Sequence, residues 1–450
     1  MPVRLMESLA TTGEMAEIFS DHSVLEAMLA FEVGLARAEA RLGLIPAPAA
    51  AAIAAAARTD SFDTSELAAQ TLRAGTPGIP LSKALTERVR SVDASAAGFV
   101  HWGATSQDVA DTAMVLLLKK ARSVLERDLG RLDAALIRHS ENHKNTVMLG
   151  RTLMQAAPPV TFGLKVAGWL GSLRRSRELL DDCYAAALIL QFGGATGTMA
   201  SLGDKGLKVC AELARDLNLA LPEAPWHAHR DRLAALLSAC GVLVGSLGKA
   251  ACDIILLAQS EVGEVAEGGG QGRGGSSTMP HKQNPIGCTV TLAAAQRVPP
   301  LVATFLSSMV QQHERGVGGW QAEWSTVSSV IQATGLAIGS MAEVAEGLTV
   351  NAKRMRANIE ATHGLIFAER AMMLLAPNLG RDAAHRLIEK ASKDSIAQGK
   401  RLSEILAGMP EVTAILGRSV LSELEKPEEY LGAAEQLRVR LISKLDPKED

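Results

Sequence analysis

A stretch of 37 residues without proline, from Asp231 to Glu267, constrains the fold more than any other feature of this 450-residue chain. As a single α-helix it would be about 55 Å long, because each helical residue adds about 1.5 Å. Residues 233–248 carry no charge, and apolar side chains fall on more than one side of the expected helix. Such a helix must be buried on nearly every side. The bundle of one chain is too thin to cover it, so the stretch predicts a homo-oligomer joined along this region.

The rest of the chain predicts an all-α fold. Aromatic residues make up only 3% of the sequence, while Ala, Leu and Gly are abundant, which favours packed helices over sheets. No alternating apolar and polar pattern of useful length indicates a strand. A capping box at residues 105–108 is expected to open a long helix that runs to about His143. Further long helices are expected at residues 161–190, 285–312 and 321–348, with loops at 150–159 and 193–203. We expect three helical domains: residues 1–104, a central bundle of long helices over 105–348, and residues 349–450.

Composition argues against several classes of protein. The net charge is −3 and there are only two Tyr, so the chain lacks the basic face and the stacking rings of a nucleic-acid binder. The five Cys form no CxxC pair, which suits small buried side chains in a reducing cytosol. The uncharged run at 233–248 is shorter than a bilayer-spanning helix, and the first ten residues lack the apolar core of a secretory leader. We expect a cytoplasmic protein that binds neither nucleic acid nor membrane.

The polar loop over residues 268–285 is the strongest functional signal. It contains the sequence GGSSTMPHKQNP, whose glycines let the backbone approach a ligand closely. Asn284 followed by Pro285 is typical of the N-cap and first residue of a helix, whose positive end would then face the loop. An ordinary flexible linker would explain the glycines alone, but not the hydroxyls, imidazole and lysine behind them.

The charge pattern around this loop is also unusual. Residues 268–312 contain no Asp or Glu, so Arg273, Lys282 and Arg297 leave the segment locally positive in a chain of negative net charge. A positive field of this kind attracts anions. Together with the expected helix start, it predicts a site for an anionic small molecule.

Three separate motifs carry a resemblance to a known family. The loop sequence GSSTMPHKQNP resembles the GSSxMPxKxNP motif of the fumarase/aspartase superfamily, with every fixed position filled. HWGATSQDVADTA at 101–113 and GRTLMQAAPPVTFG at 150–163 agree in order and spacing, so the resemblance covers essentially the whole chain. At His281 the loop resembles that of adenylosuccinate lyase and that of the bacterial cycloisomerases of 3-carboxy-cis,cis-muconate. The runs at 313–315 and 320–324 resemble the cycloisomerases in particular.

The resemblance implies a homotetramer with a core of long helices, active sites each assembled from three subunits, and neither a metal nor an organic cofactor. It implies that Ser276 moves a proton to or from carbon, with Lys282 beside it as a second catalytic residue. The implied substrate-binding residues are His101, Thr105, Ser106, Thr152, Gln155, Arg230, Ser277, Met279, His281, Asn284 and Arg315. A further region that contacts substrate in the family lies near Arg230, and Trp226, His227 and His229 also fall near it.

Some of these residues also fit plainer explanations. His101 is equally consistent with a histidine packed beside Trp102, and His281 with a spacer in the loop. Arg315 follows a long expected helix, where a cation also interacts favourably with the helix dipole. Trp320 and Trp324 lie four residues apart, a spacing that also suits packing in a core.

Two departures from the family pattern bear on the reaction. Lyases of the superfamily usually carry His directly after the GRT of the second motif, where this chain has Leu153, and Glu seven residues after the loop lysine, where it has Thr289. That pair protonates or activates the leaving group, a task that requires a group with a pKa near neutral. Paired loss suggests chemistry that needs no such group.

Lactonisation of a muconate meets this condition, because a carboxylate of the substrate is itself the nucleophile and only one carbon needs a proton. We therefore expect a cycloisomerase that interconverts 3-carboxy-cis,cis-muconate, a small tricarboxylate, and 4-carboxymuconolactone during the breakdown of aromatic acids. Two alternatives are a fumarate-releasing lyase such as adenylosuccinate lyase, and a structural protein that keeps the scaffold without activity.

Overall fold

The computed structural model describes residues 5–268, 274, 275, 278, 279 and 282–443. The chain divides into two compact units, each made of three separated stretches. Unit 1 comprises 1–130, 175–248 and 290–340, and unit 2 comprises 131–174, 249–289 and 341–450. The division into three domains by sequence stays a prediction.

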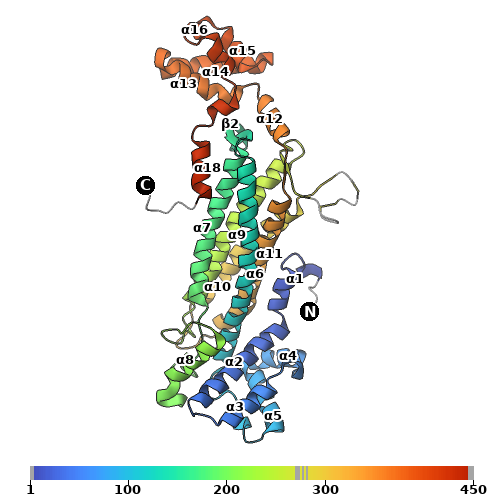
Figure 1. Ribbon diagram of the computed structural model, residues 1–450, viewed down its shortest axis with the longest axis vertical. Coiled ribbons are helices and arrows are strands. Elements are labelled where there is room, and N and C mark those ends of the chain that lie inside the picture. The colour runs from blue at the N-terminus through green and yellow to red at the C-terminus, as the bar shows by residue number, and fades with distance from the viewer. Residues whose placement is uncertain (1–4, 269–273, 276–277, 280–281, 444–450) are drawn as a thin grey trace. The chain divides into compact units, whose positions relative to one another are not determined.

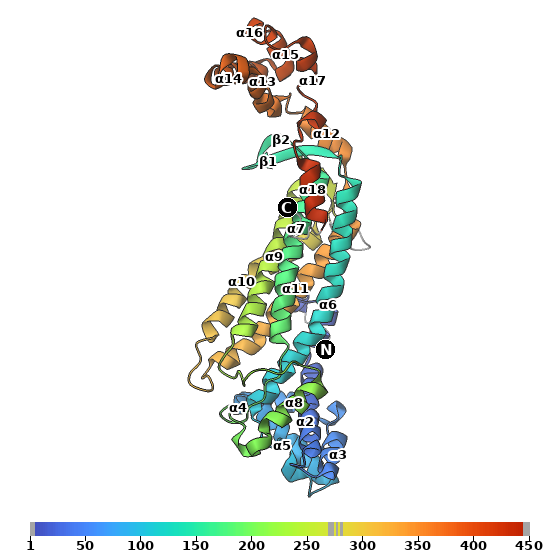
Figure 2. The same cartoon turned by 60° about the vertical axis from the view of Figure 1, so that its left-hand side comes forward.

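The fold is all-α, as predicted (Figure 1). Long helices dominate both views, and within unit 1 segments of five of them run side by side (Figure 2). These helices are α6 (Ser106–Asn142), α7 (Phe162–Ala187), α9 (Asp231–Ala258), α10 (Ile286–Ser308) and α11 (Gly319–Gly347). Their positions agree with the helices expected from apolar spacing, apart from a few residues at the ends of most of them.

Helix α9 is shorter than the sequence predicts. It ends at Ala258, nine residues before Glu267, although no proline marks the end. Gly263 takes a left-handed φ of 60°, and Arg354 donates to the carbonyl oxygens of Glu261 at 2.6 Å and of Val262 at 3.0 Å. A side chain about 90 residues away therefore satisfies carbonyl groups that a longer helix would have used internally.

Two described helices, α9 and α11, are long and apolar enough to span a membrane by length and composition alone. Core helices meet the same criterion, and 50% and 61% of the residues in the two most apolar windows are buried within the chain. The finding is therefore weak evidence for a membrane span.

Unit 1 also contains helices that are shorter than the five long ones. They are α1 (Gly13–Ile18), α2 (Asp21–Arg41), α3 (Ala47–Ala56), α4 (Thr64–Ala74), α5 (Gly78–Val92) and α8 (Gly206–Leu217). Helix α2 packs against α3 and α8 and buries one face, which includes Leu25, Phe31 and Leu35. The same buried face carries two acids, Glu32 and Glu39, which become important below.

A β-hairpin occupies the place where the sequence predicts a loop in unit 2. Strand β1 (Val147–Thr152) pairs antiparallel with β2 (Gln155–Thr161), with an irregularity after Leu149. The strand pattern is hidden because β2 contains two prolines, which are normally confined to strand edges and bulges. A Cβ at Gly150 would lie 2.4 Å from the carbonyl oxygen of Pro158, so this position of the hairpin requires glycine.

The C-terminal part of unit 2 has its own apolar core, formed around Leu375, Ile388, Leu402 and Leu406. Its helices are α12 (Ala352–Glu360), α13 (Ala368–Leu379), α14 (Arg381–Gln398), α15 (Leu402–Ala407), α16 (Pro410–Thr413), α17 (Arg418–Glu423) and α18 (Ala434–Ile442). Two further short strands, β3 (Val265–Ala266) and β4 (Thr349–Val350), also pair in unit 2.

Candidate functional site

The start of helix α6 brings together three of the predicted substrate-binding residues. Thr105 precedes the helix, Ser106 is its first residue, and both are half-buried. Arg315, 210 residues further along the chain, donates a 2.7 Å hydrogen bond from Nη1 to Thr105 Oγ1. Its Nε lies 3.3 Å from Gln107 Oε1. Both acceptors are neutral, and among the described residues the Arg315 guanidinium has no ion-pair partner, so its charge remains available to an anion.

Asp108 holds the backbone of this region in place. Its carboxylate accepts from the backbone N–H of Thr105 at 2.9 Å, which is one half of the predicted capping box. It also accepts from the N–H groups of Gly193 and Gly194 at 3.0 and 2.9 Å, in the glycine-rich connection after α7. His227 Nε2 lies 2.7 Å from Asp108 Oδ1 and is buried. His227 therefore lies beside this carboxylate as part of the support of the site.

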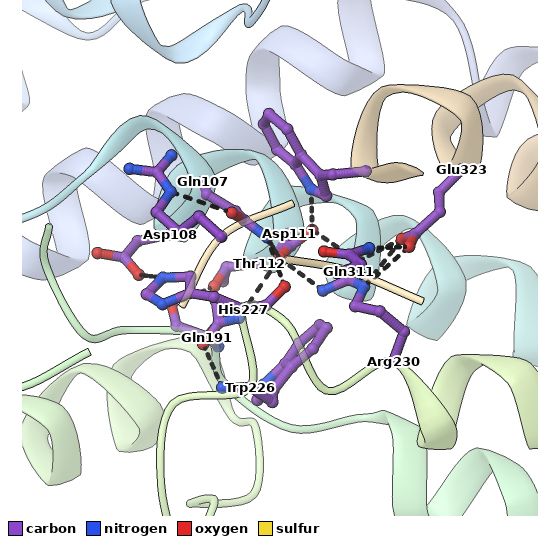
Figure 3. A network of polar contacts seen from close by, with 12 residues as sticks. Gln107, Asp108, Asp111, Thr112, Gln191, Trp226, His227, Arg230, Gln311 and Glu323 are labelled. Carbon is purple, nitrogen blue, oxygen red and sulfur yellow. Dashed lines mark hydrogen bonds and ion pairs between the residues drawn. The ribbon is translucent and has the colours of Figure 1, made fainter. Parts of the chain in front are cut away.

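A larger buried network continues from Asp108 along α6 (Figure 3). It joins Gln107, Asp108, Asp111 and Thr112 on α6, Gln191, Trp226, His227 and Arg230 before α9, Gln311 after α10, and Glu323 on α11. Gln107 and Asp111 are four residues apart and so lie on one helix face. The runs at 101–113 and 320–324 contain Asp111 and Glu323, but the sequence assigned neither of them a role. Glu323 is the only charged residue between Arg315 and Glu343, which is a signal, whereas Asp111 follows Asp108 in a helix rich in charged residues and has no comparable signal.

Arg230 lies at the centre of this network. Its guanidinium donates to both oxygens of Asp111, at 2.8 and 3.0 Å, and to Glu323 at 2.6 and 2.9 Å. The residue is only 3% exposed, and the ring of Trp226 lies 4.7 Å from its Cζ. All three guanidinium nitrogens are thus bonded to internal carboxylates. Direct binding of a substrate by Arg230 stays a prediction that this arrangement does not favour.

Glu323 shares that single guanidinium with Asp111. Burial raises the pKa of Glu323 to about 7, although the charge and hydrogen bonds of Arg230 act in the opposite direction. Two carboxylates around one cation cannot both be compensated, so a proton on Glu323 near neutral pH completes the balance of charge.

His101, in the first motif, pairs with an acid that the sequence did not single out. Its Nδ1 lies 2.6 Å from Glu32 Oε1, and its side chain is 19% exposed. The backbone of His101 takes a left-handed φ of 59°, an uncommon conformation for a residue with a side chain. His101 is therefore an oriented imidazole beside a carboxylate, a more specific arrangement than simple packing against Trp102.

The hairpin of unit 2 carries the other predicted motif. Thr152 and Gln155 face each other at the end of the strands and are exposed. Between them, Leu153 and Met154 form a two-residue turn in which both have positive φ, 48° and 65°. Such turns normally use Asn or Gly, and a left-handed residue with a side chain costs about 1–2 kcal/mol. Leu153 is 97% exposed, so this chain holds an apolar side chain at the tip of the second motif.

Ser276, Ser277 and His281 lie outside the described residues, as does Arg273. Of the other loop residues, Met279 and Lys282 are exposed, and the N–H of Lys282 donates to Met279 O at 3.0 Å. Asn284 is half-buried, and its N–H donates to Gly274 O at 2.9 Å, which closes the loop at its base.

The start of α10 differs from the prediction. The helix begins at Ile286, one residue after Pro285, and the N–H groups of Gly287 and Cys288 point to Glu267 Oε1 and Oε2 at 2.7 and 3.3 Å. The positive end of the helix thus binds an internal carboxylate, rather than leaving both groups open to a ligand. The acid lies directly before the acid-free stretch that suggested an anion site.

Thr289 occupies the first turn of α10, where the superfamily pattern has Glu. Its hydroxyl donates to Pro285 O at 2.8 Å. Its only transferable proton is therefore engaged with the backbone. Among the residues that the structure describes, no group of three or more His, Cys, Asp or Glu is placed to hold a metal ion.

Comparison with known proteins adds to this geometry. Residues 7–299 match the family described as "Lyase", and residues 364–441 match "Adenylosuccinate lyase C-terminus". The chain is 47% identical to a 3-carboxy-cis,cis-muconate cycloisomerase from Bradyrhizobium diazoefficiens, over 98% of both chains. It is 41% identical to a nitrosuccinate lyase from Streptomyces davaonensis, over 94% of this chain and 91% of that protein.

The solved structures agree with these relatives. The crystal structure of 3-carboxy-cis,cis-muconate lactonizing enzyme from Pseudomonas putida has a TM-score of 0.92 with this chain, at 44% sequence identity over 98% of each chain.

Proposed function

The chain belongs to the fumarase/aspartase superfamily of lyases, and on that premise we propose that it is a cycloisomerase interconverting 3-carboxy-cis,cis-muconate and 4-carboxymuconolactone. The relatives named for this reaction are similar to the chain over nearly its whole length. Its site offers the guanidinium of Arg315, which pairs with no carboxylate in the described part of the chain and lies beside the hydroxyl of Thr105, as a tricarboxylate substrate requires.

The observation that carries the proposal is what occupies positions 153 and 289. Leu153 has no titratable group, and the hydroxyl of Thr289 is bonded to the backbone. Neither can deliver a proton to a departing amine or alcohol. A reaction without such a leaving group is the one that remains compatible with the rest of the motifs.

Lactonisation has this property. A carboxylate oxygen of the substrate forms a C–O bond to an alkene carbon within the same molecule. The alkene electrons move toward the neighbouring carbon, where the charge is delocalised into an adjacent carboxylate, and that carbon then takes one proton. One C–O bond and one C–H bond form, one C=C bond is lost, and nothing leaves. In reverse, the leaving group is a carboxylate, which departs without a proton.

We assign the transfer of the carbon proton to Ser276. A serine hydroxyl is a weak acid and a weaker base, so it needs stabilisation of its alkoxide by nearby donors and by the charge of Lys282. The substrate carboxylates are proposed to contact Thr105, Ser106, Arg315, Thr152, Gln155 and Asn284. The motifs fall in two compact units of the chain, and we propose that they meet in a homotetramer whose active sites are shared between subunits.

A fumarate-releasing lyase is the second candidate, because one relative at 41% identity is named nitrosuccinate lyase. Nitrite, unlike an amine, is a stable anion as it leaves and needs no proton. Positions 153 and 289 therefore argue against release of an amine more strongly than against release of nitrite.

The test is conversion of 3-carboxy-cis,cis-muconate by purified protein, followed by loss of the conjugated-diene absorbance and by NMR identification of the lactone. Ser276→Ala is expected to lose most turnover with unchanged helicity and oligomeric state, whereas Ser277→Ala, its neighbour, is expected to retain more. Near-normal turnover by Ser276→Ala would remove the role of this serine while leaving the reaction itself in place.

A further inference from the structure

Two acidic residues on helix α2, Glu32 and Glu39, are buried without being part of any predicted motif. They lie seven residues apart, so both point to the same side of the helix, and they are 2% and 0% exposed. Glu32 Oε2 and both carboxylate oxygens of Glu39 have no hydrogen-bond partner among the described residues. Burying an acid is costly unless it is paired or protonated, so each of the two requires an explanation.

For Glu39 the explanation is a proton. Burial raises its pKa to about 9, and the nearby charge of Glu32 adds to the effect. Glu39 is therefore neutral at physiological pH. Glu32 differs from Glu39 because one of its carboxylate oxygens has a side-chain partner.

Among the described residues, the carboxylate of Glu32 has one hydrogen-bond partner, the imidazole of His101, with Nδ1 at 2.6 Å from Oε1. Burial by itself would lower the pKa of His101, but the charge and hydrogen bond of Glu32, with a contribution from Asp108, raise it above its ordinary value. Two acids thus act on the imidazole of His101: Glu32 from α2 and Asp108 from α6. Each acid has a titratable neighbour of its own. Glu39 lies on the same face of α2 as Glu32, and His227 pairs with Asp108.

The geometry leaves one donor of this imidazole free. Nδ1 is taken by Glu32, and Nε2 has no hydrogen-bond partner among the described residues, while the side chain remains partly exposed. As an imidazolium, His101 offers an N–H at Nε2. As a neutral ring that keeps its proton at Nδ1 for the acceptor Glu32, it offers only a lone pair there. The charge state therefore decides whether Nε2 attracts or repels a carboxylate.

We propose that Glu32 is a positioning residue that keeps His101 protonated, so that Nε2 of the imidazolium donates to a carboxylate of the substrate. This inference rests on the proposed function, because it assumes a polycarboxylate in the site. The chain then has an imidazole–carboxylate pair, but not at positions 153 and 289, where lyases of the superfamily usually carry His and Glu. It also supplies a charge-assisted donor that the fully bonded Arg230 does not provide.

The proposal has a specific pH signature. Above the pKa of His101 the donor at Nε2 is lost, so KM for 3-carboxy-cis,cis-muconate should rise with pH while kcat changes little. Glu32→Gln keeps an oxygen acceptor for Nδ1–H but removes the charge, so the rise in KM should begin at least about one pH unit lower, which corresponds to roughly a tenfold loss of kcat/KM on the alkaline side. His101→Gln carries a donor that does not titrate, so this alkaline rise in KM should disappear.

Glu39→Gln is the matched control, with the same replacement on the same face of the same helix. Because Glu39 is already neutral, this variant should keep the wild-type pH dependence of KM. The proposal is overturned if Glu32→Gln lowers kcat/KM by the same factor at every pH, or if His101→Gln keeps the alkaline rise. If Glu32→Gln does not fold, the His101→Gln profile still tests the donor itself, and an alkaline rise that persists in this variant overturns the proposal. A wild-type protein that does not convert the muconate at any pH would instead count against the proposed function.

Discussion

Arg315 Nη1 donates to Thr105 Oγ1 at 2.7 Å, so the segment between α10 and α11 is fixed to the start of α6. Arg315 is half-buried, and among the described residues no carboxylate pairs with it, in contrast to Arg230, which two carboxylates hold. The two arginines therefore have different roles. We propose that Arg230 stabilises the fold, and that Arg315 keeps its charge for a ligand.

Replacing Arg315 should weaken substrate binding more than folding. Arg315→Gln should lower kcat/KM about 10- to 100-fold, mainly through KM, because a hydrogen bond to a charged group contributes about 1.5–3 kcal/mol. Arg315→Lys should lie between this variant and the wild type, since it keeps the charge but loses the fork of donors. Steady-state kinetics and thermal melting give the two readouts. Arg418→Gln, at an exposed arginine of the C-terminal region, is the control; an equal effect of both changes would contradict the assignment.

Replacing Arg230 should damage the fold. Arg230→Met leaves Asp111 and Glu323 buried without a cation, which should lower the free energy of unfolding by about 3–5 kcal/mol. Glu323→Gln is the comparison, and it should cost far less near pH 7, because Glu323 is already partly protonated there. Urea denaturation measures both. A Met variant with wild-type stability and a raised KM would assign Arg230 to the substrate instead.

Glu39 should make stability depend on pH. Its pKa is raised from 4.5 to about 9 in the folded chain. Between these values the folded state holds a proton that the unfolded state releases, so stability falls as pH rises, by up to about 1.4 kcal/mol per pH unit. Glu39→Gln removes this dependence. Its melting temperature should exceed that of the wild type clearly at pH 8 and little at pH 5; an equal difference at both pH values would contradict a protonated Glu39.

Glu267 should control the start of α10. Glu267→Ala removes the acceptor for the N–H groups of Gly287 and Cys288 and should destabilise the protein by about 0.5–2 kcal/mol, the usual range for loss of a helix cap. Glu267→Gln keeps an oxygen acceptor for these N–H groups, so it should destabilise the protein less than Glu267→Ala. Amide hydrogen exchange over the first turn of α10 reports the change directly, with α14 as an internal reference. Unchanged exchange there in the Ala variant would show that the cap is not what holds this helix end.

The fold could be predicted from the sequence where its signals are local. The apolar spacing gave the long helices, and the spacing in the first motif gave the start of α6, including the bond from Thr105 N–H to Asp108. The hairpin could not be predicted, because Pro158 and Pro159 mask its strand pattern. The end of α9 depends on Arg354, which reaches its carbonyl region from about 90 residues away.

In the candidate site, too, the residues within local motifs could be predicted and the long-range partners could not. Motif matching found Thr105, Ser106 and Arg315, which the structure brings together. It could not find Glu32, which lies 69 residues before its partner His101 in an Ala-rich helix with other acids. Nor could it show that Arg230 is held by Asp111 and Glu323, because pairing between distant helices depends on tertiary packing. The ion-pair partners that lie far apart in the sequence are therefore the main part of the site that could not be predicted.

The central claim, that the chain performs lactonisation rather than release of fumarate, is tested most directly by comparing kcat/KM for three substrates on the same purified protein. One is 3-carboxy-cis,cis-muconate, followed by loss of diene absorbance, and the others are adenylosuccinate and nitrosuccinate, followed by the appearance of fumarate. Our account predicts that the muconate is converted to the lactone with a kcat/KM at least about 100-fold higher, a difference of about 2.7 kcal/mol in transition-state stabilisation. Faster formation of fumarate from either competitor, with little or no lactone from the muconate, would contradict it.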